Sequence, residues 1–370
     1  MNFDVLQRLD YPGEGGWSSA PIAASGNGDV LMSFGAAGYM NLPPYYIVPP
    51  SGSVINVKPA GVPAGGFTPR WLSNANVILS AEVVGILQPG GAWVELPIPS
   101  SPGTKVSSMN SLGQIIGVFQ DSRKNNEYVA CLANPSGSGP VTYTLVSLAE
   151  AFTKAGITGS GGILAINDAG WVLLSGDTSS TIVNISNPND PAVVHSNIPL
   201  FNVSTMSSAG SIAGVQYDDD GSGTLFEFYD PSKPTQGVGG VISVDLSGLW
   251  TLSGTYTLTP DDLSITIGKV NSSGQLVGTI GGTLDSGVYQ SFGYYWDLEN
   301  GGQLLTAGGL DEGAVIIAAT SISDTGKIVA TVLEAPGGNT FGVILDRVMR
   351  LGNPPTPKPI GPGPIRKSPF

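Results

Sequence analysis

The most regular feature of the chain is a short pattern of apolar and small polar positions that recurs along its length. In the three clearest copies, Met109–Gly117, Met206–Gly214 and Val270–Gly278, an apolar residue precedes Asn or Ser, two mostly small or polar residues and Gly follow, and then come one variable residue, two apolar residues and Gly. A pattern that returns at a regular spacing is typical of repeat architectures. The seven copies are Ala24–Met32, Leu72–Ser80, Met109–Gly117, Ile166–Leu174, Met206–Gly214, Val270–Gly278 and Ile322–Ala330.

Each copy predicts a tight hairpin turn between two strands. An apolar strand end runs into Asn/Ser-x-x-Gly, where Gly adopts a positive φ without steric cost, and a buried strand follows. One copy has Asn76 in place of Gly, and Asn is the next best residue for that left-handed conformation. The expected turn residues lie near positions 28, 76, 113, 170, 210, 274 and 326.

The spacing of these turns predicts the fold class. They lie about 50 residues apart on average, close to the ~40–50 residues of a propeller blade, and further apolar segments such as Gln290–Leu298 and Thr340–Leu345 follow most of them. About four short strands per repeat is the composition of such a blade. We therefore predict an all-β, seven-bladed β-propeller over residues 1–351. A β-solenoid is the main alternative, although its coils are usually shorter and more even in length.

The beginning of the chain predicts how the ring closes. Phe3–Asp10 is strand-like and precedes the first turn's own strand, while the last blade lacks an outer strand after Leu345. We expect Phe3–Asp10 to complete the last blade, so that strand hydrogen bonds close the ring. Ser147–Gly156 predicts one short helix, because Ser147 and Glu150 form a capping box and a glycine ends the segment.

Composition and charge exclude several classes of protein. Charged residues make up only 12% of the chain, beside 53 Gly and 29 Pro, which excludes long amphipathic helices as the main element. The net charge of −13 argues against nucleic-acid binding, which relies on clustered Lys and Arg. Cys131 is the only cysteine, so intrachain disulfides are excluded. We find no signal-peptide pattern at the start and no apolar run of the ~18 residues that a membrane helix needs, so we expect no membrane span.

The repeat resembles the bacterial HAF repeats through its Asn-x-x-Gly-x-apolar-apolar-Gly core. The resemblance covers residues 1–351 and implies an extracellular protein with a propeller-like fold. The His-Ala-Phe triplet that names those repeats is absent, and the corresponding positions hold Gln290–Phe292 and Asn339–Phe341. The resemblance implies a fold and supplies no catalytic residues.

No catalytic constellation stands out in the sequence. His195 is the only histidine, so a Ser–His–Asp mechanism would have to use it, yet no Gly-x-Ser-x-Gly elbow marks a partner serine. We expect His195 to be a residue of a strand edge or a loop. Acidic pairs such as Asp311 and Glu312 are interpreted as turn residues. The sequence thus predicts no catalytic residues, no cofactor and a non-enzymatic protein.

The best candidate for a metal site is the loop that begins at Asp218. Asp218, Asp220 and Ser222 occupy the first, third and fifth positions of a calcium loop, and carboxylate oxygens close in sequence suit Ca²⁺. The later acidic ligand is missing, because Phe226 and Tyr229 stand at the ninth and twelfth positions. A weak calcium site and a solvated hairpin tip are the two alternatives, and the hairpin tip is favoured.

Two segments are candidates for binding a partner. Tyr39–Pro50 concentrates aromatic residues and proline, and its Tyr39, Tyr45 and Tyr46 would stack on a sugar or dock on a protein. Packing of this segment over its own blade is an equally good interpretation. The segment 352–370 is rich in proline, basic and free of acidic residues, which predicts an extended arm. Its candidate contact residues are Pro354, Pro355, Lys358, Arg366, Lys367 and Phe370.

These features favour a structural or attachment propeller that its C-terminal arm anchors to other proteins of a large assembly. We favour a bacteriophage virion, in which the chain would be a tail, fibre or capsid-decoration protein, because virion proteins are made in the host cytoplasm without signal peptides. The alternative is an extracellular bacterial propeller that binds or acts on cell-surface glycan. A funnel lined with Asp, Glu and aromatic residues would distinguish this alternative.

Overall fold

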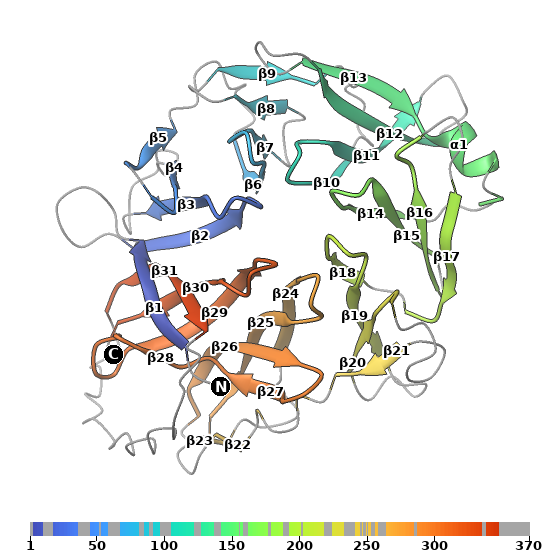
Figure 1. Cartoon of the computed structure of the whole chain (residues 1–370). Helices are drawn as coiled ribbons and strands as arrows, with labels where there is room; N and C mark the ends of the chain where they lie inside the picture. The colour runs from blue at the N-terminus through green and yellow to red at the C-terminus, as the bar shows by residue number, and fades with distance from the viewer. Residues whose placement is uncertain are drawn as a thin grey trace.

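A computed structural model of the 370-residue chain shows small β-sheets arranged in a ring around a central axis (Figure 1). The structure describes residues 3–9, 18–35, 45–51, 53–57, 67–80, 85–88, 92–96, 105–121, 127–136, 142–154, 156–157, 162–176, 179–187, 192–200, 203–217, 224–232, 241–244, 246, 249, 251–252, 256–257, 264–284, 287–334 and 338–347. All statements on structure below concern these residues.

Six of the sheets have four strands each, paired in the order in which they follow one another in the sequence. They consist of β2 (Ser18–Ala24), β3 (Val30–Gly35), β4 (Tyr45–Val48) and β5 (Ile55–Val57); β6 (Pro69–Leu72), β7 (Ile78–Ser80), β8 (Gly85–Leu87) and β9 (Trp93–Glu95); β10 (Lys105–Met109), β11 (Ile115–Asp121), β12 (Glu127–Ser136) and β13 (Thr142–Ser147); β14 (Gly162–Ile166), β15 (Trp171–Ser175), β16 (Ser180–Asn184) and β17 (Ala192–Ile198); β18 (Val203–Met206), β19 (Ile212–Tyr217), β20 (Thr224–Tyr229) and β21 (Val241–Ser243); and β24 (Ser264–Val270), β25 (Leu276–Thr283), β26 (Tyr289–Asp297) and β27 (Gly301–Leu304).

The seventh sheet contains five strands in the order β28–β1–β31–β30–β29. Their bounds are β1 (Phe3–Leu9), β28 (Ala307–Gly308), β29 (Val315–Ile322), β30 (Ile328–Leu333) and β31 (Thr340–Arg347). Outside the seven sheets lie a small hairpin of β22 (Thr251–Leu252) and β23 (Tyr256–Thr257), and the helix α1 (Ala149–Lys154). The described part of the chain therefore forms seven blades, and the prediction of a seven-bladed propeller is confirmed.

The predicted turns between the first two strands of each blade share one geometry. The seven expected turn residues all have a positive φ, from 57° at Asn76 to 88° at Gly28. In each turn the amide of this residue donates to the carbonyl three positions earlier, as Gly113 does to Asn110. The side chain at that earlier position also caps the turn: Oδ1 of Asn110 accepts the amide of Gln114 at 2.9 Å. The repeated Asn or Ser is therefore a cap for backbone amides of the turn.

A β-bulge interrupts the innermost strand of every blade. The register of the first strand against the second shifts in all seven blades, and one skipped residue lies three positions before the capping Asn or Ser. In the sixth blade, for example, Gly268 is skipped between Ile267 and Lys269, ahead of the cap Asn271. A bulge bends a strand and re-aims the side chains beside it. Each innermost strand thus curves next to the turn that ends it.

The hydrophobic core is divided over the interfaces between neighbouring blades. Seven clusters of buried residues form, and each joins side chains of two adjacent blades. Phe228 of the fifth blade packs on Trp296 of the sixth with ring centroids 5.6 Å apart. Between the last blade and the first, Leu9 and Ile344 meet Met32. Because this seventh interface joins the two ends of the series, the ring is closed.

The N-terminal strand completes the last blade, as predicted. β1 pairs antiparallel with β31 from Phe3 opposite Arg347 to Leu9 opposite Gly342. Phe3 and Leu9 are buried, and the guanidinium of Arg8 lies 3.7 Å from the centroid of the Phe341 ring. On its other side β1 pairs with β28, which runs parallel to it. The closing strand is therefore held from both sides, an arrangement that the sequence analysis did not anticipate.

The remaining predictions on local structure have mixed outcomes. The short helix is confirmed as α1, with Gly156 at a φ of 74° after its end. No helix in the described ranges has the length and hydropathy needed to cross a membrane. The arm at 352–370 lies outside the described residues, so its predicted extended form stays a prediction.

Candidate functional site at the axis of the ring

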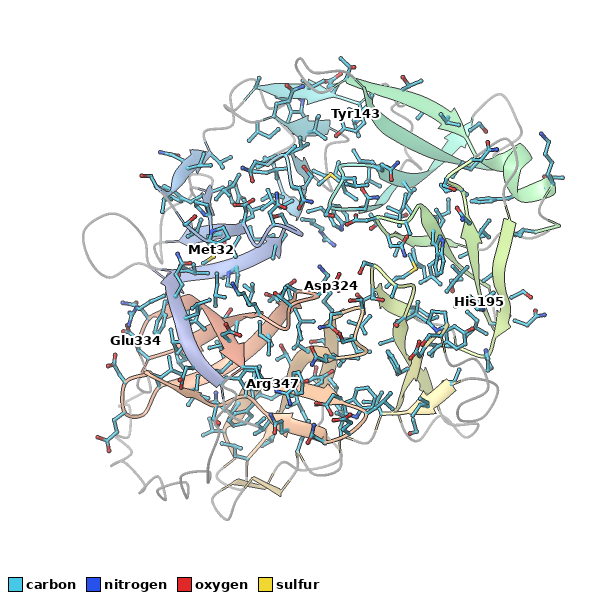
Figure 2. The ribbon with its side chains drawn as sticks, in the orientation of Figure 1. Met32, Tyr143, His195, Asp324, Glu334 and Arg347 are labelled. Atoms are coloured by element: carbon cyan, nitrogen blue, oxygen red, sulfur yellow. The ribbon has the colours of Figure 1, made fainter. Side chains whose placement is uncertain are left out.

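The inner turns bring polar residues together at one end of the central axis. The position after each capping residue is exposed or half-buried. Figure 2 shows Asp324, which occupies this position in the turn between β29 and β30, close to the middle of the ring. In chain order, the seven residues at this position are Gly26, Asn74, Ser111, Asp168, Ser208, Ser272 and Asp324.

Hydrogen bonds link these turns across the first four blades. Oδ1 of Asn74 accepts the amide of Asn27 at 2.9 Å, and the amide of Asn74 donates to the carbonyl of Ser111 at 2.7 Å. Ser111 donates its amide to Oδ1 of Asp168 at 2.9 Å and its hydroxyl to Oδ2. Both oxygens of the Asp168 carboxylate thus accept hydrogen bonds from the neighbouring blade.

Asp324 links the turns of the last three blades. Its Oδ1 accepts the amide of Ser272 at 2.8 Å, and its Oδ2 accepts the hydroxyl of Ser208 at 2.6 Å. Ser208 belongs to the fifth blade and Asp324 to the seventh. A direct bond between turns that are two blades apart shows how closely the turns converge at this end of the axis.

Lys269 lies among these carboxylates. It is half-buried on β24, directly after the bulge and close to the cap of its turn. Burial lowers the pKa of Lys269, while the negative charges of Asp324 and Asp168 act in the opposite direction. Within the described ranges its ammonium has no carboxylate within 4.0 Å. The ammonium is therefore near both carboxylates without forming a close ion pair with either.

The environment of Asp324 keeps its carboxylate ionised. Partial burial alone would raise the pKa of Asp324, but the hydrogen bonds from Ser208 and Ser272 and the charge of Lys269 outweigh it, so the pKa lies below its ordinary value. Hydrogen bonds that favour the charged form of a carboxyl group lower its pKa. Asp324 therefore acts as an acceptor, and not as a proton donor, at neutral pH.

We call Ser111, Asp168, Ser208, Lys269, Ser272 and Asp324 the axial cluster. The axial cluster has two consequences for the molecule. The hydrogen bonds hold turns of different blades together, which stiffens this end of the ring. The carboxylates of Asp168 and Asp324 nevertheless belong to exposed residues, so acceptor lone pairs at this end of the axis are available to a polar ligand. In the described ranges no three His, Cys, Asp or Glu side chains come together as metal ligands would.

The structure places the residues predicted to bind a partner as follows. Tyr45 and Tyr46 lie on β4 and are buried, with 5% and 8% of their surfaces exposed, and the hydroxyl of Tyr45 donates to the carbonyl of Phe67 at 3.2 Å. Because buried side chains do not meet a partner, their prediction as binding residues is corrected to the alternative, packing within the blade core. Tyr39 lies outside the described residues, as do Pro354, Pro355, Lys358, Arg366, Lys367 and Phe370.

The other sequence candidates are only partly described. Asp218, Asp220 and Ser222 of the proposed calcium loop lie outside the described residues, so both alternatives for this loop stay open. His195 lies on β17, the outer strand of its blade, as expected. Its Nδ1 is 2.9 Å from the hydroxyl of Tyr229, which belongs to the next blade. His195 therefore connects two blades, and no serine or cysteine is among its described contacts.

Sequence reasoning missed all six residues of the axial cluster. Its direct hydrogen bonds join turns that are 52 to 116 residues apart in the sequence, so no local motif marks these residues. One signal was present: when the seven repeats are aligned at the capping residue, Asp168 and Asp324 stand out as the charged members of one repeated position. A repeated position at the inner end of every blade must converge with its counterparts once the ring closes.

Comparisons with known proteins show a likeness of fold only. No protein-family model and no curated protein sequence matches the chain, so the resemblance to HAF repeats stays a prediction. Among solved structures, oligopeptidase B from Leishmania major is 9% identical with a TM-score of 0.43, over 89% of this chain and 48% of that one. A subtype N11 neuraminidase-like protein of a flat-faced bat influenza A virus is 11% identical with a TM-score of 0.38, over 84% and 96%. An α-L-arabinofuranosidase from Podospora anserina is 10% identical with a TM-score of 0.30, over 68% and 95%.

These structures correct one expectation. The sequence analysis predicted a protein that is not an enzyme, and the similar structures include an oligopeptidase and α-L-arabinofuranosidases. The lack of a recognisable catalytic motif therefore does not separate this chain from enzymes with a comparable arrangement of sheets, and the prediction is not retained. At these identities and TM-scores no residue role or substrate is transferred to this chain.

Proposed function

We propose that the chain recognises carbohydrate at the axial cluster. The observation that carries the proposal is the meeting of Asp168, Asp324 and Lys269, from three different blades, at one end of the axis. A funnel lined with acidic and aromatic side chains would distinguish a propeller that binds glycan from an attachment protein. Acidic side chains at the centre of the ring are one part of that feature. The attachment role in a virion depends on an arm outside the described residues and has no such observation in its support.

The chemistry of the cluster suits a ligand with many hydroxyl groups. A sugar hydroxyl both donates and accepts hydrogen bonds, so it can meet a carboxylate, an ammonium or a serine. Hydrogen bonds to charged groups contribute about 1.5–3 kcal/mol each. The net charge of −13 disfavours polyanionic ligands such as nucleic acids through long-range repulsion. A neutral glycan avoids this repulsion. An extracellular location goes with this proposal.

The proposal covers binding with or without cleavage of the glycan. Glycoside hydrolysis commonly uses two carboxyl groups on either side of the scissile bond, and the axial cluster contains two. Asp324 remains ionised at neutral pH, which suits a nucleophile or a stabilising charge and not a general acid. One experiment with two readouts separates the two cases. Retention of the glycan measures binding, and the release of reducing ends measures cleavage.

A glycan array with the full chain tests the proposal. Lys269→Met removes the ammonium and keeps an unbranched side chain of nearly the same length, and we expect binding to weaken about tenfold or more. Lys154→Met is the matched control, because it makes the same change of charge on α1, far from the axis (Figure 1), and we expect wild-type binding. Asp324→Asn should also weaken binding, with a thermal melt to confirm that the ring remains folded. The proposal falls if the wild type retains no glycan or if Lys269→Met binds as the wild type does.

A further inference from the structure

An exposed tyrosine lies at the opposite end of the sixth blade from the axial cluster. Tyr289 is the first residue of β26 and 57% exposed, and Val288 before it is equally exposed. Most large apolar side chains of the described residues are buried, and only five are markedly exposed. Among the described aromatic residues of this blade, Tyr289 is the exposed one, which makes its ring a candidate contact for a ligand.

The backbone beneath this ring is shaped to receive it. Tyr289 pairs with Thr283 of β25, and its phenol ring lies over Gly281 of the same strand. A Cβ at position 281 would lie 2.3 Å from the hydroxyl oxygen and 2.9 Å from Cζ of Tyr289, so only glycine leaves room for the ring. The side chain thus leans from β26 over β25 towards the innermost strand, and more than half of its surface stays open to solvent.

The described residues around the ring are uncharged and rich in hydroxyl groups. Gly281 pairs with Ser264 at the start of β24, and both Ser264 and Thr266 are exposed. The nearest described charges on this blade, Lys269 and Asp297, belong to the other ends of β24 and β26. Ser264 and Lys269 are five residues apart, about 17 Å along an extended strand. This surface is therefore separate from the axial cluster.

From this geometry we propose that Tyr289 is a stacking platform for a neutral sugar ring, with Ser264 and Thr266 as hydrogen-bonding groups beside it. The inference rests on the carbohydrate recognition proposed above and adds a second subsite of stated chemistry. A tyrosine fixed against glycine offers a rigid, flat apolar face at a small entropic cost. The C–H groups on one face of a pyranose match such a surface, and its hydroxyls match the serine and threonine. A charged peptide would find no described partner here.

Three variants on the same glycan array test the platform. Tyr289→Ala removes the ring, and we expect about a tenfold loss of retention of neutral glycans. Tyr289→Phe keeps the ring without its hydroxyl and should stay within about threefold of the wild type, which a stacking role predicts. Val288→Ala is the matched control, an exposed apolar neighbour whose loss should leave retention unchanged. Thermal melts of all three should match the wild type, because both side chains are largely exposed.

The outcomes separate this inference from the proposed function. If Lys269→Met loses binding while Tyr289→Ala binds as the wild type does, the platform is overturned and carbohydrate recognition at the axis stands. If Tyr289→Ala and Val288→Ala weaken binding equally, stacking is not the cause and the platform is also overturned. If the wild type retains no glycan and instead captures a neutral peptide from a peptide array, both proposals fall. The platform is supported if Tyr289→Ala loses retention of neutral glycans while Tyr289→Phe and Val288→Ala retain them nearly as the wild type does.

Discussion

At the scale of single residues, the contact between His195 and Tyr229 shows how one side chain connects two blades. Nδ1 of His195 lies 2.9 Å from the tyrosine hydroxyl, and the two rings meet edge to face with centroids 5.6 Å apart. Burial lowers the pKa of His195 below its ordinary value of 6.5. The neutral imidazole can accept the hydroxyl proton at Nδ1, whereas the imidazolium has no acceptor nitrogen. The imidazolium can instead donate from Nδ1 to the tyrosine oxygen, so protonation reverses this hydrogen bond and its cost is the desolvation of the charged ring.

The lowered pKa of His195 predicts that the free energy of unfolding depends on pH below about 6.5. The unfolded chain binds the proton at higher pH than the folded chain, so stability is fully present above pH 6.5 and declines as the pH falls through the folded pKa. Because the chain has only one histidine, His195→Gln should remove this dependence. Urea titrations at pH 5, 6, 7 and 8 measure it. An equal decline in wild type and His195→Gln would contradict the prediction.

The residue scale also shows what the sequence could reveal. Positive φ is a requirement of one residue and its peptide bonds, so Gly and Asn mark the seven turns without knowledge of the rest of the fold. The neighbours of those turns could not be read in this way. A Cβ on Gly210, for example, would lie 2.3 Å from Cζ3 of Trp171 in the preceding blade. This second reason for glycine becomes visible only once the blades are packed.

At the scale of elements, β1 shows how packing and pairing combine in one strand. Phe3 and Leu9 are buried, and Phe3 contacts Tyr295 of the sixth blade with ring centroids 5.6 Å apart. Leu6 on the same strand lies at the register shift and is 54% exposed. Arg8 donates to Glu334 at 2.7 Å, but both side chains are well exposed, so this ion pair contributes little. The buried ends of β1 therefore carry most of its contribution to stability.

Substitutions in β1 test this division. Phe3→Ala should lower the free energy of unfolding by about 3–5 kcal/mol, because it leaves a cavity between the closing sheet and the sixth blade. Leu6→Ala, the matched control on the same strand, should cost about 0.5 kcal/mol or less. Deletion of residues 1–10 removes the whole strand and should lower the Tm by about 10 °C or more. Chemical and thermal denaturation measure these effects, and an unchanged melting transition after the deletion would rule out the closure.

The elements that the sequence predicted are those whose signals are local. The alternation of turns and apolar segments predicted the first two strands of each blade and, after most turns, further strands such as β20, β26 and β31, and Phe3–Asp10 could be assigned to the last blade because that blade lacked a strand. The two-residue strand β28 gave no signal, since Ala307 and Gly308 become a strand only by pairing with β1. The axial cluster escaped prediction for the same reason: its bonds exist only after turns far apart in the sequence meet.

At the scale of the whole molecule, the chain order ties the last blade to the first. β1 belongs to the sheet of the last blade, while β2 begins the first blade after a connection of eight residues. The interface between these blades buries Met32, whose Cε would lie 2.6 Å from a Cβ at Gly342 (Figure 2 labels Met32). In addition, the amide of Gly342 donates to Oγ of Ser19 at 3.2 Å. A short covalent connection across an interface keeps its two halves at high effective concentration.

A permuted chain separates this covalent tie from the contacts themselves. Residues 11–347 followed by a short glycine linker and residues 1–10 would retain every strand, because Phe3 pairs directly with Arg347. The last blade would then form from one continuous segment, and side-chain packing and hydrogen bonds such as that from Gly342 to Ser19 would hold it to the first. The matched control is residues 1–347 in native order. We expect the two chains to have similar free energies of unfolding, because in each of them one non-covalent contact between segments far apart in the sequence closes the ring.

Local opening between the last and first blades should differ between the two chains. With Cys131→Ala as background, Met32→Cys places a single thiol in the interface, where the native side chain is fully buried. We expect a thiol reagent to label it several-fold faster in the permuted chain, because the interface there opens without the restraint of the β1–β2 connection. A second thiol at Leu79, buried between the second and third blades, should be labelled equally in both chains. Equal labelling at position 32 would show that the contacts between the two blades keep the ring shut without the covalent β1–β2 connection.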